Sequence, residues 1–240
     1  MGIENFPYKK VLLKISGEAF ASDDNGGVDV SKAIDIAQRI VEFLEVGVSV
    51  GVVVGGGNIL RGSSCVSKGI RRISADRMGM VSTVINGMML REALINEGVK
   101  SVVFSSFDIG GGICKLYSSD AALAEMNKGA VVISVGGIGN PFFSTDTAGV
   151  LRALELTCDV MIKATHVDGV YSDDPVKCAS AERYRILGYD QVMRERLMVM
   201  DTTAISLAYD NSMPLIVCSL FGSMKLWEVV MNRDYSTIIE

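Results

Sequence analysis

Histidine is almost absent from this chain of 240 residues, since His166 is its one example. The five cysteines are scattered and form no CxxC pair: Cys65, Cys114, Cys158, Cys178 and Cys218. A zinc site of cysteine and histidine needs closely spaced ligands, so the sequence argues against that class of site, and we expect no metal ligands of its own. An odd, scattered set of cysteines favours a reducing compartment over a disulfide framework.

Long apolar runs and an excess of positive charge are missing too. No stretch approaches the ~20 apolar residues of a membrane-spanning helix. The N-terminus, MGIENFPYKK, has an acid and a proline where a signal peptide needs apolar residues. We therefore expect a cytoplasmic protein with no membrane segment. Its net charge of −5 argues against general nucleic-acid binding, which usually requires a basic surface.

Several catalytic signatures are also absent from the sequence. There is no GxxxxGK[ST] sequence, and no GxGxxG joins a strand to a helix, so P-loop enzymes and dinucleotide-binding folds are disfavoured. The HRD and DFG sequences of protein kinases are missing. With one histidine and no GxSxG sequence, a Ser-His-Asp hydrolase has little support.

The chain does contain short apolar runs that alternate with helical patterns. The run at 48–54 is almost continuous and β-branched, as in a strand buried on both faces. Repeated strand–helix–strand order predicts an α/β protein with a mainly parallel sheet sandwiched by helices. The predicted strands are residues 11–15, 48–54, 101–105, 130–135, 160–164 and 215–218. The predicted helices are residues 76–98, 121–127, 147–157 and 224–231, and one that begins at Ser31 and ends at Gly47.

Three Gly-rich segments follow predicted strands. They are KISGE at 14–18, GGGN at 55–58 with Arg61 close behind, and GGIGNP at 136–141. Glycine lets backbone N–H groups approach an anion, and a helix N-terminus just beyond adds partial positive charge. Because parallel strands present such loops at one edge of the sheet, the three together predict a ligand that carries several phosphates. We find no repeat or long linker, so one domain over 1–240 is expected, with a polar excursion at 171–185.

Five segments carry a family resemblance: KISGEAF, GGGNILRG, ADRMGMVSTVINGMML, GGIGNPFFSTDTA and KATHVDGVYSDDP. In this order they resemble the bacterial-type uridylate kinases of the amino acid kinase family. The resemblance implies transfer of the γ-phosphoryl group of ATP to UMP, in pyrimidine nucleotide synthesis. It implies an acceptor side mainly in 9–150 and an ATP side mainly in 151–240. It also implies Mg²⁺ held mainly by ATP phosphates, and a homo-oligomer that in the family is a hexamer activated by GTP and inhibited by UTP.

The resemblance further assigns roles to single residues. Lys14 would stabilise the transferring phosphoryl group, Arg61 would clamp phosphate, and Asp146 would orient Lys14, so these three are the expected catalytic residues. The expected ATP-binding residues are Lys14, Ile15, Ser16, Gly17, Gly57, Arg61, Thr165, Tyr171 and Asp174. The expected UMP-binding residues are Gly56, Asp76, Ile138, Gly139, Asn140, Pro141, Phe142, Phe143, Ser144 and Thr145, with Asp76 on the ribose.

Structural alternatives stay open for some of these residues. Lys14 can be a strand-end lysine that reaches solvent. Asp76 lies just before a helical pattern and can be its N-cap, and Ser144 or Thr145 can cap the next helix.

Five other features carry weaker assignments. Lys163 is a weaker site candidate that can simply end a strand, and Lys177 is a weaker candidate for neutralising the leaving phosphate. His166 stands where relatives have lysine, and we expect no catalytic role for it. Ile138 stands where the family has threonine, so Ile138→Thr is expected to lower the KM for UMP unless isoleucine packs there. Residues 22–27 align with the GTP-responsive segment of the family.

A phosphate acceptor is already nucleophilic near neutral pH, so no general base is required, and catalysis rests on positioning and charge neutralisation. Two other functions stay open: a relative that forms an acyl phosphate, and a non-catalytic nucleotide- or oxyanion-binding protein. Residues 138–145 favour a nucleotide, and the retention of Lys14, Arg61 and Asp174 favours catalysis. The mean hydropathy of +0.33 and the 13 methionines, among them Met78, Met80, Met88 and Met89, favour an oligomer interface.

Overall fold

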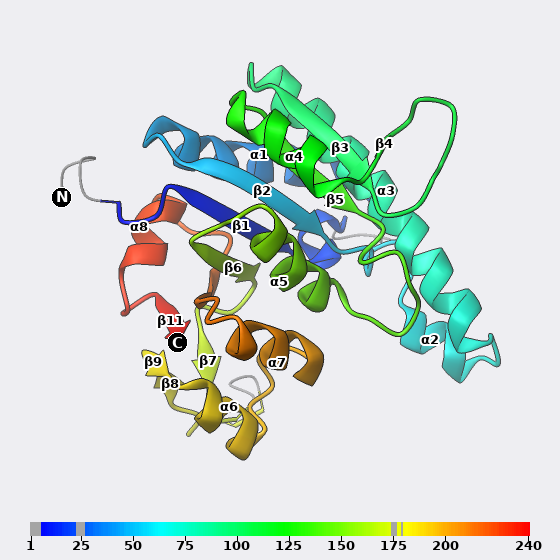
Figure 1. The fold of residues 1–240 in the computed structure, drawn as a ribbon. Helices are drawn as coiled ribbons and strands as arrows, with labels where there is room; N and C mark the ends of the chain where they lie inside the picture. The colour runs from blue at the N-terminus through cyan, green and yellow to red at the C-terminus, as the bar shows by residue number, and fades with distance from the viewer. Residues whose placement is uncertain (1–5, 23–26, 174–176, 179) are drawn as a thin grey trace.

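The computed structural model describes residues 6–22, 27–173, 177–178 and 180–240. Within this part of the chain, nine strands form one sheet (Figure 1). Their order across the sheet is β4 (Lys115–Leu116), β3 (Ser101–Ser105), β5 (Val131–Val135), β2 (Ser49–Val54), β1 (Lys10–Ile15), β6 (Val160–Thr165), β10 (Leu215–Ser219), β11 (Ser236–Ile239) and β9 (Ile186–Leu187). The first seven are parallel to one another, and β11 runs antiparallel to β10.

Helices cover both faces of this sheet, because side chains alternate between the two faces along each strand. Leu13 of β1 packs in one core with α1 (Val30–Glu45), α3 (Arg72–Asn96) and α8 (Leu226–Met231). Leu12, the preceding residue, packs in a second core. That core lies under α4 (Ser119–Asn127), α5 (Thr145–Glu155), α6 (Tyr189–Glu195) and α7 (Thr202–Asp210). The predicted class, a mainly parallel sheet sandwiched by helices, is confirmed.

The helix termini show where local predictions were right and wrong. The start of α1 was predicted at Ser31, but Asp29 is the N-cap, and its carboxylate accepts a hydrogen bond from the Ser31 N–H at 2.8 Å. Aspartate and serine are both good N-caps, and here the helix begins at Val30, so Asp29 is the cap and the serine lies inside the first turn. Gly47 follows the helix with a φ of +79°, as expected for a terminating glycine. Ser144 caps α5 as foreseen, since its hydroxyl accepts from the N–H groups of Asp146 and Thr147.

The long helix α3 begins earlier than predicted. It starts at Arg72, so Asp76 lies inside the helix and is not its N-cap. Gly69, with a φ of +89°, ends the preceding short helix α2 (Gly62–Ser67) and leaves room for this earlier start.

Short elements of the C-terminal third were missed. The polar excursion is confirmed, since β7 (Val170–Tyr171) and β8 (Arg183–Tyr184) form a separate antiparallel pair. Strands of two residues have no measurable periodicity, which explains why the sequence pattern did not reveal them. No helix in the described ranges is long and apolar enough to cross a membrane.

Candidate active site

The loops after β1 and β2 pack backbone against backbone at the carboxyl edge of the sheet. A Cβ added to Gly17 would lie 2.5 Å from the Gly57 nitrogen, and one added to Gly55 would lie 2.6 Å from the Gly17 nitrogen. At Gly56 an added Cβ would lie 2.8 Å from the Gly79 carbonyl oxygen of α3. Side chains at these positions would force the loops apart, so three glycines are needed for the approach itself and not only for turning the chain.

Polar side chains of α3 hold these loops, and sequence reasoning missed them. Asn86 is fully buried and donates from Nδ2 to the Gly55 carbonyl oxygen at 2.7 Å. It also exchanges hydrogen bonds with Asn58, at 2.8 and 3.1 Å. Thr83 accepts from the Gly136 N–H at 2.7 Å, at the end of β5. Buried polar residues inside an otherwise apolar helix were the sequence signal for this role, because such groups need partners.

A buried charge cluster lies between the loops. Lys14 of β1 is 7% exposed, and its Nζ lies 2.6 Å from Oδ1 of Asp146, the second residue of α5. Lys163 of β6 donates to Oδ2 of the same carboxylate at 2.8 Å and to the Val199 carbonyl oxygen at 2.6 Å. The Lys14 contact is a close ion pair without hydrogen-bond alignment, whereas the Lys163 contact is an aligned hydrogen bond. Lys163 therefore does more than end a strand, because its ammonium group has two hydrogen-bond partners in the cluster.

Burial and charge oppose each other at this cluster. Burial alone would raise the pKa of Asp146, but the two lysines outweigh it and hold that pKa below its usual range. The pKa of Lys163 is lowered, chiefly by burial and further by the charge of Lys14, although Asp146 opposes this. The cluster carries two positive groups and one negative group, so it presents a net positive charge to an incoming phosphate.

A cavity of about 160 Å³ is lined by Thr145, the residue before Asp146, and we call it the acceptor cavity. Five of the predicted UMP-binding residues line it, together with the predicted ATP-binding Gly57 and residues of α3. Those five are Gly56, Asp76, Asn140, Phe143 and Thr145. We call residues 136–143 the acceptor loop, because Gly137, Asn140 and Phe143 of this segment form one wall of the cavity.

Other predicted UMP-binding residues lie around the cavity but have different contacts. Ile138 packs against the second core and does not line the cavity. Phe142 has a φ of +73° and a 63% exposed side chain, and its N–H donates to Asp76 at 2.8 Å. Asp76 also accepts from the Arg72 Nε at 2.8 Å, so it ties the acceptor loop to α3. Ser144 caps α5, while Gly139 and Pro141 belong to the loop backbone.

A second cavity, of about 540 Å³, is lined by Lys163 of the cluster and by none of the residues that line the acceptor cavity, and we call it the donor cavity. Lys163, Thr165, Tyr171 and Lys177 line it, so it gathers two predicted ATP-binding residues and two weaker candidates. Asp174 lies outside the described residues. The two cavities share no lining residue, and Lys163 is the member of the charge cluster that lines the donor cavity.

The first loop presents backbone more than side chains. Ile15 is fully buried in the core, so only its main chain can face a ligand. Ser16 caps a short 3₁₀ turn and accepts from the Glu18 N–H at 3.4 Å. Arg61 forms an ion pair with Glu18, and its side chain is 61% exposed, so it is not yet directed at the buried cluster.

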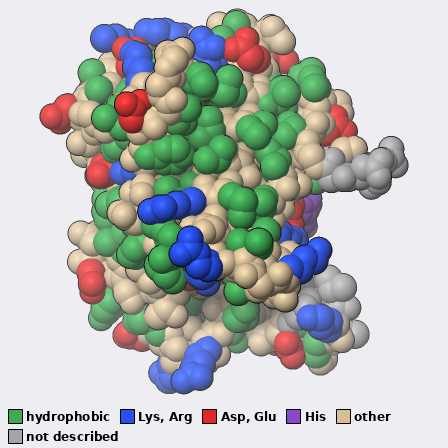
Figure 2. Space-filling view, turned by 90° about the vertical axis from the view of Figure 1, so that its right-hand side faces the viewer, with side chains coloured by type: hydrophobic (Ala, Val, Ile, Leu, Met, Phe, Trp, Pro, Cys, Tyr) green, Lys and Arg blue, Asp and Glu red, His purple; other side chains and the backbone are tan. Residues whose placement is uncertain are grey.

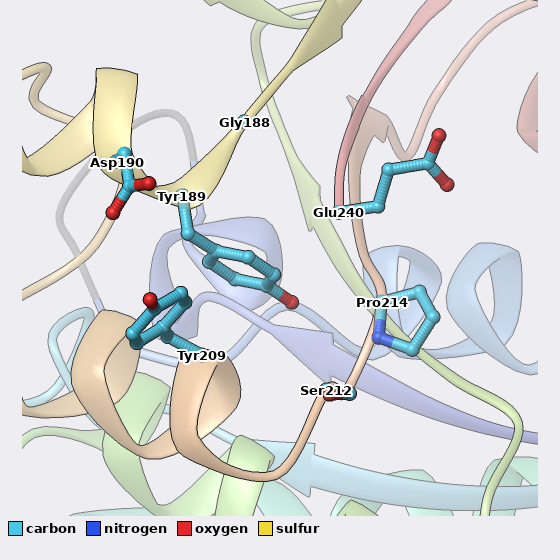
Figure 3. Close-up of a pocket in the computed structure, with 7 residues that line it drawn as sticks. All are labelled: Gly188, Tyr189, Asp190, Tyr209, Ser212, Pro214 and Glu240. Carbon is cyan, nitrogen blue, oxygen red and sulfur yellow. The ribbon is translucent and has the colours of Figure 1, made fainter.

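A third cavity, of about 320 Å³, contains none of the predicted site residues. Figure 3 shows it between the start of α6 and the end of α7, with the rings of Tyr189 and Tyr209 facing each other. Pro214, which also lines it, precedes β10, so this cavity lies at the amino edge of the parallel strands. This cavity therefore lies away from the carboxyl edge, where the loops after β1 and β2 pack together.

Comparisons with known proteins agree with this geometry. Residues 9–219 match the model of the amino acid kinase family. The uridylate kinase of Chelativorans sp. (strain BNC1) is 46% identical over 97% of this chain and 94% of its own length. The uridylate kinase of Brucella anthropi is 47% identical over 97% of this chain and 96% of its own length. The crystal structure of UMP kinase from Bacillus anthracis superposes with a TM-score of 0.91 and 34% identity, over 97% of this chain and 96% of that one.

This chain belongs to the amino acid kinase family, because the family model matches most of its length. The mainly parallel sheet, the glycine loops and the buried Lys14–Asp146–Lys163 cluster agree with that membership. Its full-length similarity within that family is to the uridylate kinases.

Proposed function

We propose that this chain transfers the γ-phosphoryl group of ATP to UMP and releases ADP and UDP. The observation that carries the proposal is a pair of cavities connected to the charge cluster: Lys163 lines one, and Thr145, which lines the other, precedes Asp146. The acceptor cavity holds five of the residues expected for UMP, and the donor cavity holds Thr165 and Tyr171, which are expected for ATP. The uridylate kinase relatives, similar over nearly their full length, support the same pair of substrates.

The reaction needs charge neutralisation more than proton transfer. The acceptor phosphate is mostly dianionic near neutral pH, so it attacks without a general base. Two polyanions must meet in line, and the positive charge of Lys14 and Lys163 is available to neutralise them, with Lys163 lining the donor cavity. Asp146 keeps both ammonium groups in place through its two oxygens. Arg61 reaches the phosphates only if it leaves Glu18, which its exposure permits.

Magnesium belongs to this proposal as a companion of ATP. Asp146, the carboxylate at the centre, is already bonded to two lysines, and no group of three metal-ligating side chains occurs among the residues that the structure describes. The residues present fit an ion bound chiefly by phosphate oxygens and water, which would neutralise phosphate charge. The lysines and the loop N–H groups act on the remaining oxygens.

A substrate panel tests the proposal and separates it from its alternatives. ADP release is measured with ATP and each of UMP, CMP, glutamate, aspartate and carbamate. We expect turnover with UMP well above all others. Turnover with an amino acid or carbamate and none with UMP would instead favour acyl phosphate formation. Nucleotide binding without ADP release from any acceptor would favour a non-catalytic binding protein.

The chain's assembly is part of the proposal, and α3 supports it. Val81, Ile85 and Met88 lie on one side of this helix and are 52%, 47% and 41% exposed, although the opposite side of α3 is buried in the core. Figure 2 views the side of the molecule where α2 and the start of α3 lie, and hydrophobic side chains gather there. A helix segment with apolar residues on both of its sides is normally covered on both, so we propose a homo-oligomer.

The resemblance extends this assembly to a hexamer activated by GTP and inhibited by UTP. Most of segment 22–27, the GTP-responsive candidate, lies outside the described residues. We further propose one domain, with its acceptor side mainly in 9–150 and its ATP side mainly in 151–240, and a cytoplasmic location. The five cysteines are all free thiols, which supports a reducing compartment.

A further inference from the structure

A buried polar network lies beneath the acceptor loop and is not part of either cavity. Its centre is Arg152 of α5, which is 4% exposed. One end of the guanidinium pairs with Glu155, and the other donates to Ser106 Oγ at 3.0 Å. Its central carbon lies 3.6 Å from the centre of the Tyr117 ring, and the Tyr117 hydroxyl donates to Glu155 at 2.8 Å. A charge this deeply buried requires such partners.

Ser106 passes this interaction on to the acceptor loop. A guanidinium has no acceptor atom, so Ser106 Oγ must accept from Arg152. The single hydroxyl hydrogen then remains for donation. The nearest carbonyl oxygen is that of Gly137, at 2.6 Å, while that of Val135 is at 3.2 Å. The two hydrogen bonds therefore run in one direction: Arg152 donates to Ser106, and Ser106 donates to the Gly137 carbonyl oxygen.

The hydrogen bond from Ser106 reaches the part of the acceptor loop that contains two glycines in the left-handed conformation. Gly137 has a φ of +59° and lines the acceptor cavity, and Gly139 has a φ of +90°. A Cβ at Gly139 would lie 3.0 Å from the Ser106 carbonyl oxygen, so the loop rests directly on Ser106. Thr83 holds Gly136 from the other side. Left-handed glycines are conformationally free, so their position depends on these contacts.

We propose that Arg152 is a positioning residue for the phosphoryl acceptor. It does not touch the nucleotide; it orients the Ser106 hydroxyl, which fixes Gly137 and the cavity wall. A charged donor is suited to this because its hydrogen bonds are short and strongly oriented. Without it, the hydroxyl can rotate toward Val135 and release Gly137. This proposal rests on the proposed function, because it assigns the supported cavity to the acceptor.

The test is a double-mutant cycle with Arg152→Met and Ser106→Ala. We expect each single variant to raise the KM for UMP about tenfold, the loss expected for one hydrogen bond, with the KM for ATP changed less than about twofold. We expect the KM for UMP of the double variant to be no higher than that of the worse single variant, because both substitutions break the same series of hydrogen bonds. Arg152→Lys keeps the charge but loses the fork, so its KM for UMP should lie between those of Arg152→Met and the unaltered chain.

A matched control separates positioning from plain stability. Arg39 of α1 is also largely buried and donates to the carbonyl oxygens of Leu220 and Met224, away from the acceptor loop. Arg39→Met should lower the Tm and leave the KM for UMP unchanged. A lower Tm with an unchanged KM in Arg152→Met, or fully additive effects in the cycle, would overturn the proposal.

Two further outcomes are covered by the same design. If Arg152→Met does not fold, Ser106→Ala alone decides, since it removes one oxygen, and an unchanged KM for UMP overturns the proposal. If the unaltered chain phosphorylates another acceptor, the proposed function fails, and the cycle is read on the KM of that acceptor. An unchanged KM there would then overturn the role of Arg152 separately.

Discussion

Lys14 and Lys163 lie directly opposite each other on the neighbouring parallel strands β1 and β6, and both contact the carboxylate of Asp146. Two buried ammonium groups side by side repel each other unless a common counterion lies between them. Lys163 lines the donor cavity, and Asp146 directly follows Thr145 of the acceptor cavity. The pairing of two strands thus brings both ammonium groups to one carboxylate, in a cluster that adjoins both cavities through Lys163 and Thr145.

Asp146→Asn should destabilise the fold and remove most activity. Losing one partner of a buried ion pair costs about 3–5 kcal/mol, and here two lysines lose their counterion. The folded pKa of Asp146 lies below its ordinary value of 3.8. Its contribution is therefore complete above that value and is lost as the pH falls through the folded pKa. Urea unfolding at several pH values should give a difference in unfolding free energy between variant and parent. We expect this difference to be largest near neutral pH and to shrink only below about pH 4.

Asp210→Asn provides the control for that measurement. Asp210 is exposed at the end of α7, so its substitution should change stability by less than about 0.5 kcal/mol. If Asp146→Asn lowers the unfolding free energy near neutral pH by no more than Asp210→Asn does, the cluster does not stabilise the fold.

Gly56→Ala and Gly57→Ala should differ sharply in stability. An added methyl group at Gly56 would lie 2.8 Å from the Gly79 carbonyl oxygen and 2.8 Å from the Ser82 Cβ, whereas at Gly57 it meets nothing within 4 Å. We expect Gly56→Ala to lower the Tm by several degrees, because backbone must move, and Gly57→Ala to leave it nearly unchanged. Calorimetry on both variants decides, and equal Tm values would contradict the close packing of the loops.

Much of this arrangement was predictable from the sequence. The apolar runs gave the six central strands, because strands buried on both faces need continuous apolar residues. The glycines after three of them gave the position of the loops. Ser144 was foreseen as a cap from its residue type, and Lys14 was identified because a lysine inside an apolar run needs a partner.

The rest depends on contacts between distant residues. The role of Lys163 could not be predicted from its own position, because it depends on the pairing of its strand with that of Lys14 and on the contact with Asp146 of α5. Asn86 and Thr83 reach loops about 30 and 50 residues away, and helical periodicity carries no information about such partners. The start of α3 was misplaced because Arg72 gives no capping signal.

Asp76→Asn should weaken UMP selectively. Its carboxylate lines the acceptor cavity and also holds the Phe142 N–H, so its loss removes a charged acceptor and loosens the loop. Hydrogen bonds to charged groups contribute about 1.5–3 kcal/mol, so the KM for UMP should rise roughly ten- to a hundredfold with the KM for ATP unchanged. Arg72→Met, which removes the ion pair and the contact of the guanidinium with the Phe142 ring but keeps the Asp76 carboxylate, should have a smaller effect. If the unaltered chain uses dUMP as well as UMP, the ribose contact is not made.

Ile138→Thr should act on stability and not on UMP. The isoleucine packs against the second core and does not line the acceptor cavity, which opposes the sequence-based expectation of a lower KM. Removing a methyl-sized volume and placing a hydroxyl there should cost about 1 kcal/mol or more. Steady-state kinetics and urea unfolding on the same preparation check this. A several-fold lower KM for UMP in the variant would show that position 138 reads the nucleotide after all.

Lys14→Ala tests the central claim most directly, because the account assigns Lys14 to the charge that develops during transfer. The measurement is kcat by ADP release, together with the Kd for UMP by calorimetry on the same variant. We expect kcat to fall by at least about 10²-fold while the Kd for UMP changes by less than about threefold, since the ammonium group acts mainly in the transition state. A kcat near that of the unaltered chain would contradict the account and remove the Lys14–Asp146–Lys163 cluster from catalysis.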